Sequence, residues 1–269
     1  MSELPKTILI TGSTDGIGLL TAKLLAAQGH KLLLHGRNLE KLEAAAEEIG
    51  GETERFIADL FDLPTVESMA KEILSRHDHL DVLINNAGIL KTQHTRTADG
   101  LDIRFVVNTF APYILARLLL EIMPKDGRIV NLSSAAQAAV NISAMAGQRE
   151  LDDMDAYSQS KLAITIWSQE LARELPEGPV VVAVNPGSLL ASKMVKEGFG
   201  IAGNDLNIGA NILCRAALDP EFSETSGKYF DNNAGKFGLP ISAALDADHV
   251  SDVMQAMEKI LSTLREKAN

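Results

Sequence analysis

The sequence predicts an α/β protein built on a parallel sheet with helices on both faces. Short runs rich in leucine and β-branched residues alternate with segments of helical periodicity, which is typical of βαβ units. Most of these runs are apolar in succession rather than in alternation, as expected for strands that are covered on both faces. No Pro/Gly-rich linker divides the 269 residues, so a single domain over residues 1–269 is predicted.

Strand and helix segments follow one another along the chain. The predicted strands are Thr7–Thr11, Lys31–His35, Arg55–Ala58, Asp81–Asn85, Arg128–Leu132, Val180–Val184 and the weaker Lys228–Phe230. The predicted helices are Ile17–Gln28, Leu39–Ile49, Thr65–Arg76, Leu101–Ile122, Ala156–Leu175, Gly209–Leu218 and Ala247–Leu264. The least regular stretches, residues 135–155 and 188–207, follow strand ends. Because ligands of open α/β sheets bind outside the carboxyl ends of strands, both stretches are expected near a binding site.

Composition argues against several classes of function. The formal net charge is −11, which disfavours non-specific nucleic-acid binding because such binding needs Lys and Arg to neutralise phosphates. No run of 18 apolar residues suggests a membrane span, and Met1–Lys6 does not resemble the start of a signal peptide. The single Cys214 excludes an intrachain disulfide and fits a reducing, cytoplasmic compartment. The histidines show no metal-ligand spacing, so no catalytic metal is predicted.

A glycine-rich turn follows the first predicted strand. It contains Gly12, Ser13, Thr14, Asp15, Gly16, Ile17 and Gly18 and leads directly into a helix. Glycine lets the backbone approach a ligand closely, and a helix N-terminus presents free N–H groups to a pyrophosphate. The spacing differs from the G-x-G-x-x-G fingerprint and lacks the Lys-Ser/Thr ending of a nucleotide-triphosphate loop. The alternative is an ordinary glycine-rich turn between a strand and a helix.

Tyr157 and Lys161 stand at positions i and i+4, so they share one face of a helix. A tyrosine hydroxyl has a reference pKa of about 10, and a nearby ammonium favours the phenolate and lowers that pKa. The pair is therefore a candidate acid–base site. The pattern Y-x-x-x-K also occurs by chance in many helices, so its interpretation depends on the surrounding motifs.

Further motifs occur in order at strand ends. They are Thr11-Gly-x-x-x-Gly-Ile-Gly18, Asp59-Leu60, Asn85-Asn86-Ala87-Gly88, Asn108, Ser134, Tyr157-x-x-x-Lys161 and Asn185-Pro186-Gly187. With this set, nearly the whole chain resembles the classical short-chain dehydrogenases/reductases. The long stretch before Tyr157 and the later Gly227-Lys228-Tyr229-Phe230 are similar to retinol-dehydrogenase-like members. The resemblance implies a single-domain Rossmann fold, a doubly wound parallel sheet of about seven strands in the order 3-2-1-4-5-6-7.

The resemblance also implies a hydride transfer between a nicotinamide cofactor and a carbonyl or alcohol substrate. Tyr157 would be the general acid or base. Lys161 would lower the pKa of that tyrosine and hydrogen-bond the nicotinamide ribose. Ser134 would hold the reacting oxygen, and Asn108 would hold a water that links Lys161 to solvent, with a distortion of its helix freeing the relevant backbone group.

Ser133 competes with Ser134 for the role beside the reacting oxygen. Both residues follow the strand that ends in Asn131-Leu132. Because strand side chains alternate between faces, only one of the two can point at the site. The family pattern places its catalytic serine three residues after this asparagine, which selects Ser134.

The cofactor is predicted to be NADP(H) rather than NAD(H). After the second strand, an NAD site would place an acidic residue that accepts from the ribose 2′-hydroxyl, and none occurs before Glu40. Arg37 can instead pair with a 2′-phosphate, and Ser13 could add a hydroxyl donor. The alternative is that Arg37 is a solvated surface residue. Asp15 is a departure, because some NADP-using members carry a basic residue within this loop.

Other cofactor contacts follow from the resemblance. Asp59 would hydrogen-bond the adenine amino group, with Leu60 supplying a backbone contact. The remaining predicted contacts are Asn38, Asn86, Ala87, Gly88, Pro186, Gly187 and Leu189. The Asn-Asn-Ala-Gly motif also fits an ordinary turn. Ser192 could replace the threonine that family members carry after Pro-Gly.

The substrate side is expected to combine a mobile loop over residues 188–207 and an insertion over residues 135–155. Met194, Val195, Phe199 and Ile201 could form an apolar substrate wall, or could simply pack over the core. The partners expected are a small-molecule carbonyl or alcohol and a second copy of the chain, as a homodimer or homotetramer paired through the helices that carry Asn108 and Tyr157. Alternatives are a catalytically silent dinucleotide-binding sensor and a nucleotide-sugar epimerase, which the glycine spacing disfavours.

Overall fold

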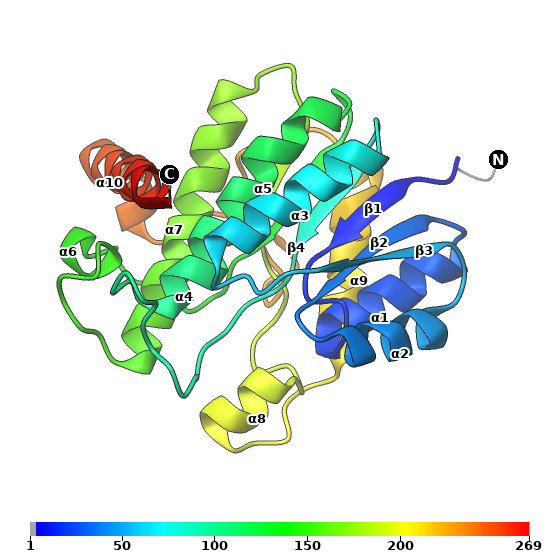
Figure 1. Ribbon diagram of the computed structural model, residues 1–269, viewed down its shortest axis with the longest axis horizontal. Helices are drawn as coiled ribbons and strands as arrows, with labels where there is room; N and C mark the ends of the chain where they lie inside the picture. Colours follow the sequence, from blue (N-terminus) through cyan, green and yellow to red (C-terminus); the bar gives the residue numbers. More distant parts are fainter. Residues whose placement is uncertain (1–3, 269) are drawn as a thin grey trace.

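The computed structural model, which describes residues 4–268, contains one eight-stranded sheet between two layers of helices (Figure 1). The strands are β1 (Thr7–Ile10), β2 (Lys31–Gly36), β3 (Thr53–Ile57), β4 (Val82–Asn85), β5 (Arg128–Leu132), β6 (Val180–Asn185), β7 (Tyr229–Asp231) and β8 (Lys236–Gly238). Their order is β3-β2-β1-β4-β5-β6-β7-β8, and only β7 and β8 pair antiparallel. The predicted order of the first seven strands is confirmed, and β8 is an additional edge strand.

Helices cover both faces of the sheet. They are α1 (Gly16–Ala27), α2 (Leu39–Ile49), α3 (Leu63–Arg76), α4 (Ile103–Phe105), α5 (Ala111–Leu119), α6 (Ile142–Met145), α7 (Asp153–Glu174), α8 (Lys193–Phe199), α9 (Leu206–Leu218) and α10 (Ala247–Ala268). The layer of α1, α2 and α9 lies on one face, and the layer of α3, α5 and α7 lies on the other (Figure 1). The prediction of a doubly wound α/β sheet is therefore confirmed.

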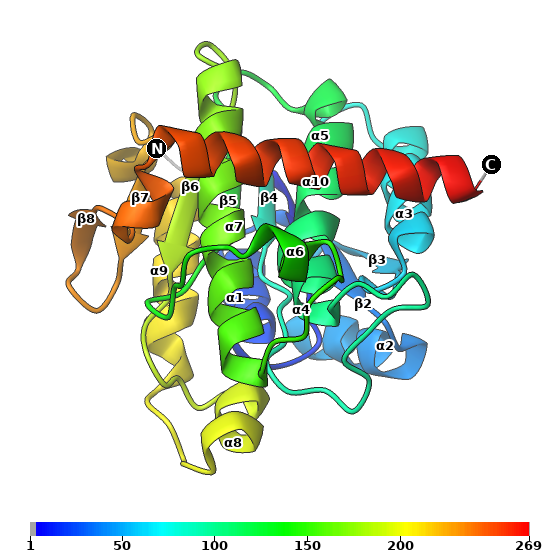
Figure 2. The same cartoon turned by 90° about the vertical axis from the view of Figure 1, so that its left-hand side faces the viewer.

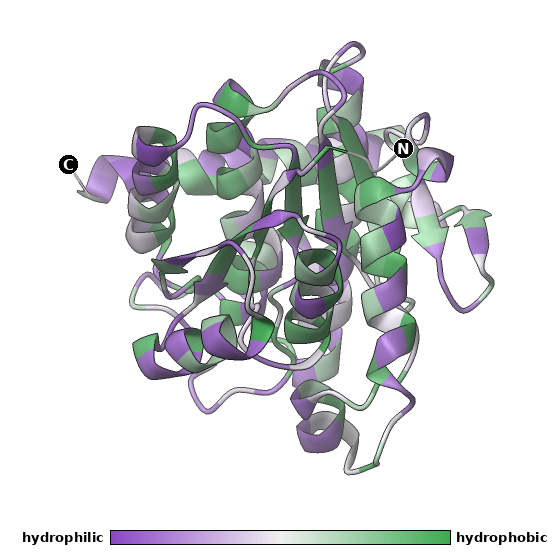
Figure 3. Ribbon diagram, turned by 90° about the vertical axis from the view of Figure 1, so that its right-hand side faces the viewer, coloured by the Kyte–Doolittle hydropathy of each residue, from purple (hydrophilic) through white to green (hydrophobic). Residues whose placement is uncertain are grey.

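Alternate residues of the central strands enter two different hydrophobic cores. In β1, Ile8 and Ile10 pack in the core beneath α1 and α9, whereas Leu9 packs in the core beneath α3, α5 and α7. All three side chains are fully buried, and burial of such a side chain contributes about 1.5–3 kcal/mol. Figure 3 shows hydrophobic strands at the centre and hydrophilic residues on the surrounding helices. Two-sided burial thus explains why the strand sequences are apolar in succession.

The predicted helix over Leu101–Ile122 is interrupted. Between α4 and α5 lies the π-helical segment η1, Val106–Phe110, in which the Ala111 N–H donates to the Val106 carbonyl. Pro112 has no N–H, so it cannot donate to the carbonyl of Asn108 four residues earlier, and the regular helical pattern is broken there. The whole stretch is apolar and long enough to span a membrane, but 72% of its apolar window is buried inside the fold, so core packing accounts for its composition.

Two predicted loops contain short helices, and one predicted strand is displaced. The helix α6 lies within residues 135–155, and α8 lies within residues 188–207. The strand expected at Lys228–Phe230 is β7, Tyr229–Asp231, and the turn after it leads into the unpredicted β8. These elements have three to seven residues, which is too short for a hydrophobic period to be read from the sequence.

The C-terminal helix α10 lies across the outer surfaces of α7 and α5 and reaches α3 (Figure 2). Its side chains Val253 and Met257 are fully buried and join the core that contains Trp167. The Tyr113 hydroxyl of α5 donates to the carboxylate of Glu258 on α10. Helix α10 therefore covers the face through which the resemblance implies that two copies of the chain would pair.

Candidate active site

A cleft of about 410 Å³ opens at the carboxyl ends of the parallel strands. The predicted residues that line it are Gly12, Thr14, Asp15, Gly16, Ile17, Gly18, Arg37, Asp59, Leu60, Asn86, Ala87, Gly88, Tyr157, Lys161 and Pro186. Lining residues that the sequence did not single out as site residues are His35, Gly36, Ala58, Phe61, Ile89, Lys91, Thr92, Ile103, Val107, Leu132 and Lys193. The structure thus gathers residues from almost the full length of the sequence at one edge of the sheet, as expected for an open α/β sheet.

The glycine loop after β1 packs closely against the end of β4. A Cβ atom on Gly18 would lie 2.2 Å from the Gly12 carbonyl oxygen and 2.5 Å from Asn86 Nδ2, which no side chain could tolerate. Gly12 itself has a φ of +67°, a conformation that favours glycine. Asn86 Nδ2 donates to the carbonyls of Thr11, at 2.8 Å, and Gly12, at 3.1 Å. The amide of Asn86 therefore fixes the shape of the loop.

The N-terminus of α1 faces the cleft with free backbone donors. The first intrahelical bond runs from the Leu19 N–H to the Asp15 carbonyl, at 3.2 Å, so the N–H groups of Gly16, Ile17 and Gly18 precede it. The Asp15 carboxylate accepts from the Gly16 N–H at 2.7 Å. This cap leaves the N–H groups of Ile17 and Gly18 as the donors available to an anion at this helix end.

Ser13 points away from the cleft, contrary to the prediction that its hydroxyl could reach a 2′-phosphate. The side chain is fully buried. Its Oγ donates to the His35 carbonyl at 3.2 Å and accepts from the His35 N–H at 3.0 Å. Both hydrogen-bonding roles of the hydroxyl are thus occupied in joining the glycine loop to β2, so it is not a cofactor donor.

The imidazole of His35 supports the same loop from below. Its Nδ1 accepts from the Gly12 N–H at 3.0 Å, and its Nε2 lies 3.1 Å from the Ala58 carbonyl, to which it donates. This arrangement requires the neutral ring with the proton on Nε2. Burial lowers the pKa of His35 to about 4 because the charged form loses its hydration. A lone histidine in a strand carries no sequence signal for this role.

The far end of the cleft presents groups that suit an adenosine 2′-phosphate. Arg37 is exposed at the rim, and Asp59 and Leu60 line the wall. Phe61, which the sequence did not indicate, adds a partly exposed aromatic ring. Asn38 does not line the cleft, because its Oδ1 accepts from the backbone of α2 and caps that helix.

Tyr157 and Lys161 lie on the same face of α7 beside the end of β5. Lys161 Nζ is buried, donates to the Leu132 carbonyl at 2.7 Å, and lies 5.7 Å from the centroid of the Tyr157 ring. Burial lowers the pKa of Lys161 to about 8. Burial also raises the pKa of Tyr157, while a hydrogen bond with Ser134 lowers it by less. The predicted lowering of the Tyr157 pKa is therefore reversed in this structure, because desolvation of the phenolate outweighs the neighbouring polar groups.

The two competing serines have separate surroundings. Ser133 is buried, and its Oγ contacts the Lys161 carbonyl at 3.2 Å and Thr165 Oγ1 at 2.6 Å, which ties β5 to α7. Ser134 is only half-buried, and its hydroxyl interacts with Tyr157. Ser133 lines the cleft, whereas Ser134 and Asn108 are not among its lining residues. The choice of Ser134 therefore stays a prediction, supported by its interaction with Tyr157.

Asn108 anchors η1 to its surroundings through every polar atom of its side chain. Its Oδ1 accepts from the Ile89 N–H at 2.8 Å, and its Nδ2 donates to the Ile89 carbonyl and to Ser160 Oγ, both at 2.9 Å. A Cβ on Gly88 would lie 3.3 Å from Asn108 Oδ1 and 3.4 Å from Lys161 Nζ. Gly88 thus permits the close approach of η1 and α7 to the cleft.

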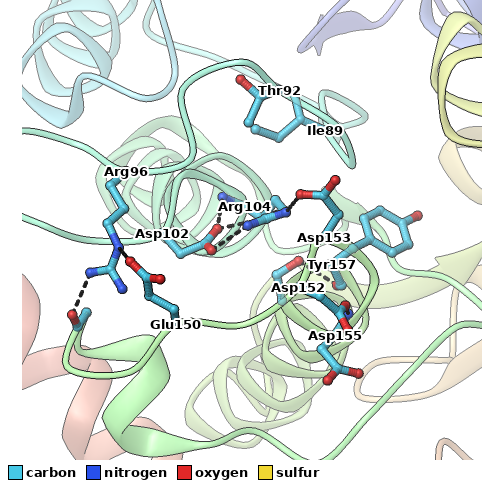
Figure 4. A network of polar contacts seen from close by, with 12 residues as sticks. Ile89, Thr92, Arg96, Asp102, Arg104, Glu150, Asp152, Asp153, Asp155 and Tyr157 are labelled. Carbon is cyan, nitrogen blue, oxygen red and sulfur yellow. Dashed lines mark hydrogen bonds and ion pairs between the residues drawn. The ribbon is translucent and has the colours of Figure 1, made fainter.

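A buried ion-pair network lies one helical turn before these residues. Arg104, four residues before Asn108, makes a two-pronged contact with Asp102 at 2.8 and 2.6 Å. It also contacts Asp153, which lies four residues before Tyr157 (Figure 4). The Arg104 side chain is 1% exposed. Since a planar guanidinium holds carboxylates in fixed geometry, this network aligns the start of α7 with the helix that carries Asn108.

The loop after β6 approaches the cleft from the opposite side. Ser192 and Met194 line the cleft, and the Ser192 Cβ lies 4.0 Å from a Cβ built on Gly16. Gly187 and Leu189, which were predicted to contact the cofactor, do not line the cleft. Both have positive φ, +125° and +53° respectively.

The predicted substrate walls are only partly formed. Of the expected apolar side chains, Met194 lines the cleft, Val195 of α8 is buried, and Ile201 is exposed. The side chain of Phe199 lies outside the described part of the structure. No residue of the insertion, 135–155, lines the cleft, because the insertion packs against α10, where the Val140 N–H donates to the imidazole of His249 at 3.2 Å.

Two other predictions concern the lack of a catalytic metal and the reactivity of Cys214. Within residues 4–268, no group of three or more His, Cys, Asp or Glu side chains is arranged to hold a metal ion. Cys214 is partly buried between α9 and α1, and burial raises its pKa to about 12. This agrees with the interpretation of Cys214 as an unreactive thiol.

Known proteins share both the sequence pattern and the fold. A family model described as short chain dehydrogenase matches residues 6–139 and 136–199. Retinol dehydrogenase 13 of Homo sapiens is 33% identical over 267 residues, which cover 87% of this chain and 78% of that protein. An uncharacterised protein of Mycobacterium paratuberculosis has a crystal structure with a TM-score of 0.79, 29% identity, and coverage of 96% of this chain and 95% of its own. A short chain dehydrogenase of Burkholderia cenocepacia in complex with NADP has a TM-score of 0.67 and 26% identity, with coverage of 84% and 95% respectively.

The neutral His35 predicts an acid sensitivity of folding. Its pKa falls from an ordinary 6.5 to about 4 on folding, so its stabilising contribution is complete above pH 6.5 and is lost as pH falls toward 4. We expect His35 to account for a decrease of roughly 3 kcal/mol in the free energy of unfolding over this interval. Urea denaturation of wild type and His35→Asn at pH 7 and pH 4.5 measures the effect. The pH dependence should weaken in His35→Asn but not in a control at the exposed His94, His94→Asn; equal dependence in both variants would refute the assignment.

Proposed function

This chain belongs to the short-chain dehydrogenase/reductase family and is similar to its retinol-dehydrogenase-like members, and we propose that it is an NADP(H)-dependent oxidoreductase acting on a carbonyl or alcohol. The observation on which this proposal rests is that Tyr157 and Lys161 line a cleft that also contains the glycine loop and Arg37. Ser134 does not itself line the cleft but interacts with Tyr157. A candidate acid–base group at one end of a site that suits a dinucleotide supports this proposal.

The residues present fit a nicotinamide dinucleotide. A Cβ on Gly18 or Gly88 would collide with or crowd the groups around the cleft, so the glycines keep a channel lined by backbone. The N–H groups of Ile17 and Gly18 would hold the pyrophosphate, Asp59 the adenine and Lys161 the nicotinamide ribose. NADP(H), when bound, supplies or accepts the hydride. The NADP complex of the similar Burkholderia cenocepacia protein supports the phosphorylated form.

Proton transfer is proposed to occur at the Tyr157 hydroxyl. Because burial raises its pKa, Tyr157 is protonated at neutral pH and can donate to a carbonyl oxygen, while the Ser134 hydroxyl hydrogen-bonds the same oxygen. Below its pKa of about 8, Lys161 is an ammonium that stabilises the phenolate left behind. In the oxidative direction, that phenolate would accept the proton of the alcohol.

Asn108 is proposed to act through its backbone rather than its side chain. The three polar contacts of its amide with Ile89 and Ser160 occupy both N–H donors and one of the two acceptor positions of Oδ1. Its carbonyl, by contrast, lacks the usual helical donor because residue 112 is proline. A water that links Lys161 to solvent would therefore bind this carbonyl.

Replacement of Tyr157 by phenylalanine tests the proposed function. NADPH oxidation is followed against a panel of aldehydes, ketones and quinones, and cofactor binding is measured separately by fluorescence. We expect Tyr157→Phe to bind NADPH like wild type and to lose turnover by about 10²–10⁴-fold, the range for removal of a general acid. A mutant within tenfold of wild type would exclude Tyr157 as the acid. If the wild-type protein binds NADPH but turns over no carbonyl, the alternative of a catalytically silent dinucleotide-binding sensor would be favoured.

The preference for NADP(H) depends on Arg37. Loss of a charge-assisted hydrogen bond costs about 1.5–3 kcal/mol, so Arg37→Ala should lower kcat/KM for NADPH by about 10–100-fold while leaving that for NADH nearly unchanged. Arg55, an exposed arginine on β3 that does not line the cleft, provides the control Arg55→Ala. The same ratio of NADPH to NADH efficiency in wild type and Arg37→Ala would contradict the assignment.

A homo-oligomer, if it forms, is proposed to use a surface other than the outer faces of α5 and α7. Those faces are covered by α10, whose Met257 is buried and whose Glu258 accepts from Tyr113. We expect hydrogen exchange in α5, α7 and α10 to be independent of protein concentration, whether light scattering shows the 28.9 kDa chain or a larger assembly. Protection of α5 and α7 that grows with concentration would show that the helices pair after all.

A further inference from the structure

We infer that the β7–β8 hairpin positions both sides of the active site, with Tyr229 holding Ser134 and the turn residues Asn232 and Asn233 holding the loop after β6. The inference rests on the proposed function, because it concerns the groups that would surround the reacting carbon. None of the three residues lines the cleft, so each is a positioning residue that acts through another group.

Ser134 lies beyond the point where the sheet fixes the backbone. The last ladder bond of this stretch runs from the Ser133 N–H to the Val184 carbonyl, at 2.9 Å. One residue later, the Ser134 carbonyl accepts instead from the Tyr229 hydroxyl, at 3.1 Å, and from Gln137 Nε2, at 3.0 Å. Two side-chain donors therefore replace the sheet in fixing the residue whose hydroxyl meets Tyr157.

The Tyr229 hydroxyl reaches across one strand to make this contact. Tyr229 is on β7 and pairs with Ala183 of β6, whereas Ser134 follows β5 on the far side of β6. The ring is 5% exposed, and burial raises the pKa of its hydroxyl, so it remains a donor at working pH. A buried tyrosine hydroxyl requires a partner, and the carbonyl of Ser134 satisfies that need.

The turn that follows β7 holds the opposite side of the cleft. Asn232 Nδ2 donates to the Pro186 carbonyl at 2.9 Å. Asn233 makes two hydrogen bonds with Ser188. Its Oδ1 accepts from the Ser188 N–H at 2.9 Å, and its Nδ2 donates to Ser188 Oγ at 2.7 Å. Pro186 lines the cleft, so the turn fixes the start of the loop that faces the nicotinamide end.

This loop contains a backbone conformation that needs external support. Leu189 has a φ of +53°, which places a non-glycine residue in the unfavourable left-handed region. Such conformations persist where the surroundings over-determine them. The contacts of Asn232 and Asn233 to Pro186 and Ser188 supply that constraint just before Leu189.

The hairpin is rigid enough for both tasks. The ring of Phe230 on β7 packs against Phe237 of β8, with centroids 4.9 Å apart, and against Phe222, at 5.2 Å. The side chain of Asn185 at the end of β6 donates to Asp231 Oδ1 at 2.7 Å. Tyr229 and the two asparagines are thus carried by one short, well-packed element, and displacement of that element would move both sides of the site together.

The Tyr229 contact is tested with two matched removals of a buried hydroxyl. We expect Tyr229→Phe to lower kcat by about 3–10-fold, the loss that corresponds to one hydrogen bond, with the Kd for NADPH unchanged. Tyr113→Phe is the control, because it also removes a buried, hydrogen-bonded hydroxyl but one that contacts Glu258 far from the cleft. Equal kcat in Tyr229→Phe and wild type, or an equal loss in Tyr113→Phe, would overturn the role of Tyr229.

A double-mutant cycle with Ser134 separates positioning from general destabilisation. If Tyr229 acts through Ser134, Tyr229→Phe should have no further effect on kcat in a Ser134→Ala background; additive losses would contradict the inference. Should Tyr229→Phe fail to fold, Gln137→Met removes the second donor to the Ser134 carbonyl. This variant should likewise lower kcat and leave the Kd for NADPH unchanged. A wild-type protein without turnover refutes the proposed function and this inference with it, whereas an active wild type with an additive cycle refutes only the inference.

The loop contact is tested at Asn233. We expect Asn233→Ala to raise the KM for NADPH by about 3–10-fold and to change kcat by less than twofold, because the substitution loosens the loop and leaves Ser134 in place. Asn211, an exposed asparagine on α9, supplies the control Asn211→Ala. An unchanged KM for NADPH in Asn233→Ala would limit positioning to Tyr229 and overturn the assignment of the turn.

Discussion

The cleft depends on the amide of Asn86, which joins the glycine loop after β1 to the end of β4. Its two hydrogen bonds to backbone carbonyls hold the loop so close that Gly18 has no room for a Cβ atom. The N-terminus of α1 then lines the cleft. Below the loop, His35 and Ser13 connect it to β2, so a cluster of buried polar groups fixes the shape of the pyrophosphate end.

Burial determines the protonation of the groups at the other end. The ammonium of Lys161 satisfies the Leu132 carbonyl, and its distance from the Tyr157 ring leaves desolvation as the larger influence on both groups. The result is a protonated tyrosine beside a lysine whose pKa of about 8 lies near the working range. Such a pair favours donation of a proton, and it charges the lysine under the conditions in which a phenolate must be stabilised.

The sequence predicts the features that depend on local patterns and misses those that depend on distant contacts. Successive apolar residues revealed the buried strands because both faces of β1 enter a core. The glycine loop and the Tyr157–Lys161 pair were evident because each has a fixed local spacing. By contrast, the orientation of Ser13 is set by His35, which lies 22 residues away, and no local signal records it. The β7–β8 hairpin was not predicted because β8 has only three residues. The turn Asn232-Asn233-Ala234-Gly235 before β8 was nevertheless a usable sequence signal for a hairpin.

The distribution of charge reconciles an acidic protein with an anionic cofactor. A net charge of −11 creates a field that opposes the approach of a dinucleotide phosphate. The cleft reverses this locally, because its lining carries four cationic side chains, Arg37, Lys91, Lys161 and Lys193, against the carboxylates of Asp15 and Asp59. Low-dielectric walls strengthen the field of charges within a cleft, and surface carboxylates more than about 10 Å away are screened at physiological salt. The cations of the cleft therefore favour an anionic ligand there despite the negative total charge.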